Sequence, residues 1–279
     1  AEDGIRDRSP SRGLGDVYKR QLLNLPNRPN RRIITSMDKG LGFIRNIKLD
    51  WLDAAAAYAA TAADAKELRA RLEPIVAADR SGPHAVRKSL DVLVAIWYKS
   101  RDLAPDLYRQ ALDTAQTTHN PAERLWLHYG LTVLTYPFFR RCAGVIGQLA
   151  RTDETITRRQ VIERLTAEMG ALGSLPRSTE RVMASLGDWG LLQPTARRDA
   201  YAPVYRALTA DSVELEAWLL ACTLRAEPDR AVPFADLVRL PMLFPFRFTV
   251  TAGQLRRLPG FDVQRQGVDL EMVRVTTAE

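Results

Sequence analysis

Residues 157–204 read TRRQVIERLTAEMGALGSLPRSTERVMASLGDWGLLQPTARRDAYAPV, and this stretch decides the fold. Thr157 is a good helix N-cap, and Gln160 three residues later completes a capping-box pattern. A turn with two glycines at 170–175 separates two helical segments. In both segments apolar residues recur at spacings of three and four, which is the period of an amphipathic helix: Val161, Leu165, Met169, Val182, Leu186 and Trp189.

A short basic hairpin is expected after the second helix. Residues 191–192 begin a strand, a turn with Arg197 and Arg198 at its tip follows, and residues 200–204 return. Helix, turn, helix and basic hairpin in this order are typical of a winged helix-turn-helix. We therefore predict such a domain over residues 137–208.

The second helix has the division of residues that a DNA-reading helix needs. Its apolar stripe anchors it, while small polar and arginine residues on the opposite face can reach base edges and phosphates. Glu180, at the front of this helix, opposes tight phosphate contact. With the first-helix arginines, the basic hairpin and a short helix near the carboxyl end, the predicted DNA-contacting residues are Arg158, Arg159, Arg177, Ser178, Thr179, Arg181, Ser185, Arg197, Arg198, Gln254, Arg256 and Arg257.

The net charge of +7 is unevenly distributed along the chain. Basic residues are in excess in residues 22–48, 137–210 and 239–265, whereas residues 49–136 are nearly neutral. Such blocks are the electrostatic pattern of a nucleic-acid-binding surface. The same blocks of charge are also expected on an ordinary solvated surface in an arginine-rich proteome. Charge alone therefore does not distinguish a nucleic-acid-binding surface from a solvated one.

The amino-terminal residues are expected to lie outside the folded body. Residues 1–21 resemble a translated sequencing adapter, so we exclude them from fold reasoning as non-native and expect an incomplete gene. Residues 22–39 form a proline-broken basic arm that either follows DNA phosphates or stays disordered. Its exposed arginines are Arg28, Arg31 and Arg32.

Residues 40–136 predict a helical bundle. Asp50 is expected to cap a helix over residues 51–63, and proline or asparagine marks the later helix starts. Pro137 divides the most apolar segment, because proline lacks an amide donor and clashes with the preceding turn. After it, Gly144 and Gly147 predict a helix that closely approaches a neighbour.

Residues 209–279 repeat the order of the first domain. Asp211 is expected to cap a helix to Arg225, Thr251 caps a helix over residues 252–258, and extended segments follow at 261–264 and 268–275. Two interpretations stay open: a second, degenerate winged-helix-like domain, or a packing extension with a β-hairpin. The fold class predicted for the whole chain is mainly α, with small β-hairpin wings.

Composition excludes several classes of protein. Two cysteines provide neither a disulfide framework nor a four-cysteine zinc site, and the three histidines share no metal-ligand spacing. No apolar run approaches the roughly 18 residues of a membrane span. Glycine-rich phosphate loops, nucleophile elbows and paired acidic metal sites are all missing from the sequence. We therefore expect a non-enzymatic cytoplasmic protein with no cofactor, no metal and no membrane partner.

Three short motifs carry a resemblance to a known family. They are Leu125-Trp126-Leu127, Tyr136-Pro137-Phe138 and STERVMASLGDWGLL at residues 178–192. With the preceding helical domain, they resemble the BrxA family of BREX phage-defence systems over roughly residues 40–205. The long carboxyl third departs from that family. The resemblance implies a helical protein with winged-helix features that binds DNA as an accessory to a bacterial multi-gene defence system.

Two functions are thus carried forward. The first is a DNA-binding accessory or regulatory protein, which contacts duplex DNA through its winged helix. The second is a protein-interaction scaffold, in which the winged helices dock partner subunits and DNA affinity is small.

Overall fold

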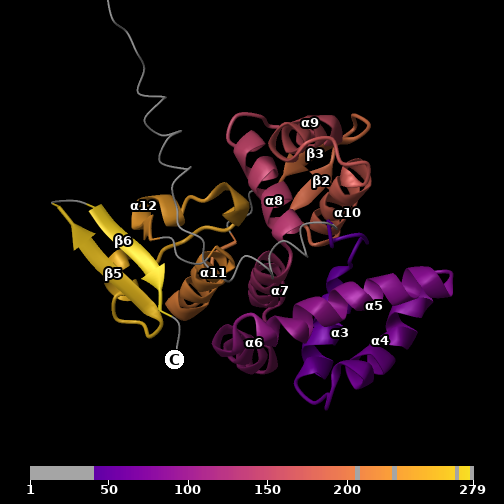
Figure 1. Cartoon of the computed structure of the whole chain (residues 1–279), viewed down its shortest axis with the longest axis horizontal. Helices are drawn as coiled ribbons and strands as arrows, with labels where there is room; N and C mark the ends of the chain where they lie inside the picture. Colours follow the sequence, from indigo (N-terminus) through magenta and orange to yellow (C-terminus); the bar gives the residue numbers. More distant parts are fainter. Residues whose placement is uncertain (1–40, 205–207, 228–230, 268–269, 277–279) are drawn as a thin grey trace, which may run out of the picture. The chain divides into compact units, whose positions relative to one another are not determined.

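The computed structural model describes residues 41–204, 208–227, 231–267 and 270–276 (Figure 1). They form a mainly helical fold with two small antiparallel sheets of three strands each, as the sequence predicts. The segments expected to be adapter-derived (1–21) and a basic arm (22–39) lie outside the described residues. None of the described helices has both the length and the apolarity to cross a membrane.

A helical bundle forms the first part of the described chain. It consists of α3 (Leu49–Ala59), α4 (Ala65–Asp79), α5 (Pro83–Trp97), η1 (Lys99–Asp102), α6 (Pro105–Thr117) and α7 (Pro121–Thr135). Proline occupies the first turn of α5, α6 and α7, where its missing amide donor is not needed. The expected start of the first helix is wrong: Asp50 lies within α3, and the residue before the helix, Lys48, makes no side-chain cap.

Helix α7 is the centre of the core. Every residue from Leu125 to Thr135 is buried, and the helix packs against α11 (Val213–Ala226) as well as against α5, α6 and α8. Gly130 makes the α11 contact possible, because a Cβ atom there would lie 2.4 Å from Cζ3 of Trp218. The end of α7 confirms the expected break, since α8 (Pro137–Leu149) begins at Pro137.

A buried polar network joins α7 to α3 and α5. The indole N–H of Trp97 donates to Nδ1 of His128 over 3.1 Å, so Nδ1 carries a lone pair and Nε2 carries the proton. Nε2–H then donates to Oδ1 of Asp53 over 3.0 Å, and Arg124 Nε donates to the same oxygen over 2.7 Å. His128 is fully buried, and this burial lowers its pKa below 6.5 against the opposing effect of Asp53. The imidazole is therefore neutral in the fold.

The neutral His128 predicts acid sensitivity. The unfolded chain takes up a proton near pH 6.5, whereas the folded chain resists it, so stability is complete above that pH and falls below it. We expect the melting temperature to fall between pH 7 and pH 5, and His128→Gln to lose part of this slope. His119→Gln, at an exposed histidine, should keep the wild-type slope. Equal slopes for wild type and His128→Gln, measured by thermal melts, contradict the prediction.

The first α/β unit spans residues 137–203. After α8 it contains β1 (Ile156–Thr157), α9 (Arg158–Met169), α10 (Leu175–Asp188), β2 (Leu192–Pro194) and β3 (Ala200–Pro203). The capping box at the start of α9 is confirmed: Thr157 Oγ1 accepts from Gln160 N, and the Gln160 side chain accepts from Thr157 N. The sheet order is β1-β3-β2, and both neighbouring pairs are antiparallel. Figure 1 shows the three helices around this short sheet.

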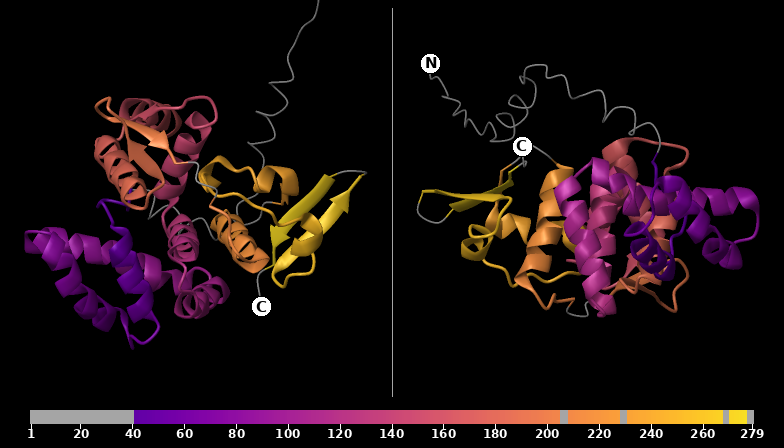
Figure 2. Two further views of the ribbon diagram at one scale, coloured as in Figure 1. Left: turned by 180° about the vertical axis from the view of Figure 1, so that it is seen from behind. Right: turned by 90° about the horizontal axis from the view of Figure 1, so that it is seen from below.

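The second α/β unit spans residues 213–275 and repeats that order. It contains α11, β4 (Val232–Pro233), α12 (Phe234–Leu237), η2 (Pro241–Leu243), α13 (Ala252–Leu255), β5 (Phe261–Gln266) and β6 (Leu270–Val275). The sheet order β4-β6-β5 matches β1-β3-β2 position by position. In both views of Figure 2 the β5–β6 hairpin extends away from the rest of the unit.

Two expectations for this second unit need correction. Ser212, rather than Asp211, caps α11, because its Oγ accepts from Leu215 N. Thr251 caps α13 as predicted, within a capping box that includes Gln254, but the helix contains only four residues and ends before Leu258. Glu216 of α11 is buried, and its carboxylate accepts hydrogen bonds from the amides of Thr249 and Val250.

Both α/β units are fixed by direct contacts with other parts of the described chain. Ile47 N donates to Ser185 Oγ over 2.8 Å, and Trp189 Nε1 donates to Ile47 O over 2.9 Å, so the segment before α3 holds α10. Helix α8 packs against η2 with Gly147 facing Pro241. The described residues from 41 to 276 accordingly form one compact unit.

Candidate nucleic-acid interface

Helix α10, the expected reading helix, is covered on two sides. Its apolar stripe packs inside the first α/β unit, and a second stripe that includes Ser185 faces the segment before α3. The remaining face carries exposed Arg177 and Glu180 and half-buried Arg181 and Ala184. Arg177 and Arg181 are four residues apart and are therefore neighbours on that face.

Ser178, Thr179 and Ser185 were expected to contact DNA, and their burial overturns this expectation. They are 2%, 0% and 0% exposed. Ser185 Oγ bonds the amide of Ile47, the side chain of Asn46 and the carbonyl of Arg181. Such bonds account for the burial of Ser185, whereas Thr179 Oγ1 is buried without a hydrogen-bond partner among the described residues, so a helical wheel alone misplaces these side chains.

Arg158 joins the three parts of the unit that carry the remaining basic residues. From the first position of α9 it reaches Asp199 in the β2–β3 loop over 2.6 Å and Glu180 on α10 over 3.5 Å. Its backbone amide also donates to Asp199 O. The guanidinium thus pairs with two carboxylates and offsets one of their two negative charges. Arg159, the next residue, is 86% exposed and pairs only with Glu163 of its own helix.

The loop between β2 and β3 presents Arg197 and Arg198 to solvent, as predicted. Thr195 closes the loop, because its amide and hydroxyl both donate to Ala200 O. The Arg198 side chain is 96% exposed, and its closest carboxylate is that of Asp199 at 4.0 Å. Arg177, Arg181 and Arg197 have no carboxylate partner among the described residues.

Two arginines near this surface were missed from the sequence. Arg45 precedes α3, and Arg80 follows α4, where its Nη2 donates to Asn46 O over 2.8 Å. Burial lowers the pKa of Arg80, and the positive charges of Arg181 and Arg45 lower it further. Arg80 belongs to residues 49–136, whose charges sum to nearly zero, whereas Arg45 belongs to the basic segment 22–48. Only the fold brings these two charges beside α10.

The predicted residues of the second α/β unit do not form a comparable surface. The side chain of Gln254 is used in the α13 capping box, and Arg256 pairs with Glu271 over 2.9 Å. Arg257 is exposed and has no carboxylate partner among the described residues. A one-turn α13 cannot present a row of side chains to a groove as α10 can.

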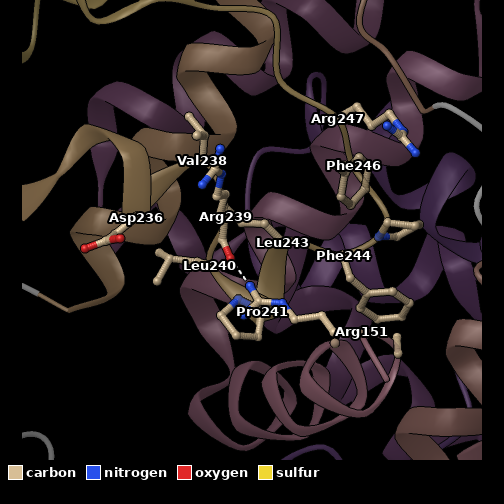
Figure 3. A pocket seen from close by; sticks show the side chains of 13 residues that line it. Arg151, Asp236, Val238, Arg239, Leu240, Pro241, Leu243, Phe244, Phe246 and Arg247 are labelled. Atoms are coloured by element: carbon tan, nitrogen blue, oxygen red, sulfur yellow. Dashed lines mark hydrogen bonds between the residues drawn. The ribbon is translucent and has the colours of Figure 1, made fainter. Parts of the chain in front are cut away.

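A pocket of about 640 Å³ lies where α8 meets the α12–η2 segment (Figure 3). Apolar residues such as Pro241, Phe244 and Phe246 form much of its wall. One N–H of the Arg151 guanidinium donates a hydrogen bond to the backbone carbonyl of Arg239. In Figure 3 the guanidinium groups of Arg239 and Arg247 lie apart, so the positive charges do not converge on one ligand position.

A second pocket of about 590 Å³ is acidic and lies between α6, α11 and the start of β5. Trp218, Leu107 and Phe261 contribute its apolar surface. Asp106, Asp113, Glu123 and Glu214 surround it, and no basic residue lines it. No group of histidine, cysteine and acidic side chains in the described part of the chain is arranged to hold a metal ion.

Comparison of the chain with protein-family models, curated proteins and solved structures found no match.

Proposed function

We propose that this protein binds duplex DNA through its first α/β unit, acting as a winged helix-turn-helix. The order helix, strand, helix, helix, strand, strand and the antiparallel β1-β3-β2 sheet support this interpretation. In such a domain the second helix of the pair enters the major groove, and the hairpin loop contacts the flanking backbone. Helix α10 and the Arg197–Arg198 loop take these two positions.

The observation that carries the proposal is the set of available arginines around Arg158. Arg177 and Arg181 come from α10, Arg159 from α9, and Arg197 and Arg198 from the hairpin loop. Arg158 bonds carboxylates on α10 and on that loop, which ties the three elements together and offsets one of the two opposing charges. Arg177, Arg181 and Arg197 have no carboxylate partner among the described residues, and the ion pairs of Arg159 and Arg198 are exposed, so these side chains remain for phosphates and base edges.

Duplex binding should therefore be strongly dependent on salt. Each neutralised phosphate releases counterions, so five contacts predict a slope of log K against log salt concentration of roughly −4 to −5. Arg177→Ala/Arg181→Ala is expected to weaken binding roughly 10- to 100-fold and to make the slope shallower by about 2. Fluorescence anisotropy with a labelled duplex, from 25 to 300 mM salt, measures both quantities.

Arg109→Ala is the matched control for this experiment. Arg109 is an exposed arginine on α6 with no carboxylate partner among the described residues, so the variant loses a similar charge away from α10. Its affinity should stay within about twofold of wild type. Absence of binding at low salt, or binding that does not change with salt, removes the proposal.

The role we propose for this binding is that of a non-enzymatic accessory or regulatory component of a multi-gene system such as phage defence. The resemblance to the BrxA family supports it. The alternative, a scaffold that docks partner subunits, has support from the acidic pocket with its apolar surface. The salt titration separates the two, because a scaffold has little affinity for a duplex at low salt.

A further inference from the structure

We propose that Arg45, Arg80 and Arg181 together form a phosphate site, so that the helical bundle takes part in DNA binding and receives a backbone phosphodiester. This inference rests on the proposed function and deepens it. The three arginines come from the segment before α3, from the end of α4 and from α10. They thus connect the bundle to the proposed reading helix.

Asn46 and Ser185 are the structural centre of this arginine cluster. Arg80 Nη2 donates to Asn46 O over 2.8 Å, while Ser185 Oγ donates to Asn46 Oδ1 over 3.3 Å. Ser185 also bonds the carbonyl of Arg181 one turn earlier in α10. Arg45 is covalently adjacent to Asn46. Asn46 and Ser185 thus connect the guanidinium of Arg80 to the backbone of α10 at Arg181, and Arg45 adjoins Asn46 in the chain.

The cluster lacks the anions that an arginine group normally has. Nε of Arg45 and Nε of Arg181 are buried, and neither has a hydrogen-bond partner among the described residues. Nearby Asp79 is already engaged by Lys48 Nζ at 2.9 Å and by the indole N–H of Trp51 at 3.1 Å. A buried donor without an acceptor is costly, and like charges repel each other. One anion placed among the three guanidinium groups removes both costs.

A phosphodiester of the bound duplex is the anion that suits this position. Arg181 shares its face of α10 with Arg177, so DNA that contacts Arg177 also places backbone near Arg181. Guanidinium groups match phosphate oxygens with paired N–H donors. Contact from the bundle then adds a second attachment of the protein to the same duplex and fixes its orientation.

Two neutral variants of the bundle test this site. Arg45→Gln and Arg80→Gln should each weaken duplex binding roughly 5- to 10-fold and make the salt slope shallower by about 1. Arg109→Gln should leave both unchanged. Arg45→Gln is the more direct test of the site. Arg80 also stacks over the Trp51 ring at 5.3 Å, so Arg80→Gln changes packing as well as charge.

Inorganic phosphate provides a readout that is independent of DNA. At 20 mM, and against chloride of equal ionic strength, phosphate should raise the melting temperature of wild type by about 2–4 °C. It should not raise that of Arg45→Gln or Arg181→Gln. Without phosphate, Arg181→Gln should melt no lower than wild type, because it removes a repulsive charge.

The outcomes separate the inference from the proposed function. If wild type binds the duplex while Arg45→Gln and Arg80→Gln bind equally well, the bundle takes no part and the inference is wrong, although the function stands. A phosphate effect on melting with unchanged duplex affinity indicates a free-phosphate site and also overturns the inference. If wild type does not bind the duplex at all, both proposals fail.

Discussion

Alanine at Gly147 is expected to destabilise the protein by about 3 kcal/mol, because the backbone of another segment occupies the space that the new methyl group needs. A Cβ atom at Gly147 would lie 1.9 Å from the carbonyl oxygen of Pro241 and 2.7 Å from its carbonyl carbon. Backbone atoms of η2 cannot move aside as a flexible side chain can. Helix α8 and η2 must therefore separate, which exposes the apolar contact between the first and second α/β units.

Gly144→Ala is the control for this substitution, on the same helix and three residues earlier. The nearest atom to its added Cβ is Met242 Cβ at 4.0 Å, an ordinary contact distance. Alanine favours a helix interior over glycine by about 1 kcal/mol, so this variant should be neutral or slightly more stable. Urea unfolding of both variants gives the comparison. Equal stability of Gly147→Ala and Gly144→Ala means that α8 does not contact Pro241 as described.

These two glycines illustrate what sequence patterns can predict. Both were expected to allow close approach of a neighbour, yet only at Gly147 would an added Cβ meet backbone atoms. The sequence pattern could not distinguish the two glycines, because the neighbouring segment lies about ninety residues further along the chain. Local signals were more reliable: the Thr157–Gln160 capping box and the break at Pro137 depend on adjacent residues, and both are confirmed. The repeated sheet order depends on strand pairing over longer distances, and the sequence indicated only the two hairpins, without the third strands β1 and β4.

At the candidate site, too, the sequence predicted local features but not contacts between residues far apart in the chain. Exposure of Arg177, Arg197 and Arg198 followed from helix and loop positions in the sequence. Burial of Ser185 did not follow, because the atoms that cover it belong to Asn46 and Ile47, about 140 residues earlier. The nearness of Arg80 to Arg181 was equally invisible, since net charge over a segment carries no information about its position in space.

Removal of Arg158 is expected to weaken duplex binding about 100-fold, which is more than the loss of any single exposed arginine. Arg158→Ala takes away one positive charge, leaves Glu180 unpaired and leaves Asp199 with only its 4.0 Å contact to Arg198 on the proposed DNA-binding face. Like charges brought together at an interface cost several kcal/mol. Stability should change little, because partly exposed ion pairs contribute only about 0–1 kcal/mol. Anisotropy titrations with the labelled duplex and thermal melts measure the two effects.

Arg159→Ala and a rescue variant make this prediction specific. Arg159 is the next residue and is more exposed, so its removal should cost tenfold or less, as expected for one phosphate contact. Arg158→Ala/Glu180→Gln/Asp199→Asn removes the unpaired carboxylates and should recover most of the lost affinity. Asparagine suits position 199, where φ is 59°, because it tolerates the left-handed region. If the triple variant binds as weakly as Arg158→Ala, Arg158 acts by direct contact with DNA and not by neutralising Glu180 and Asp199.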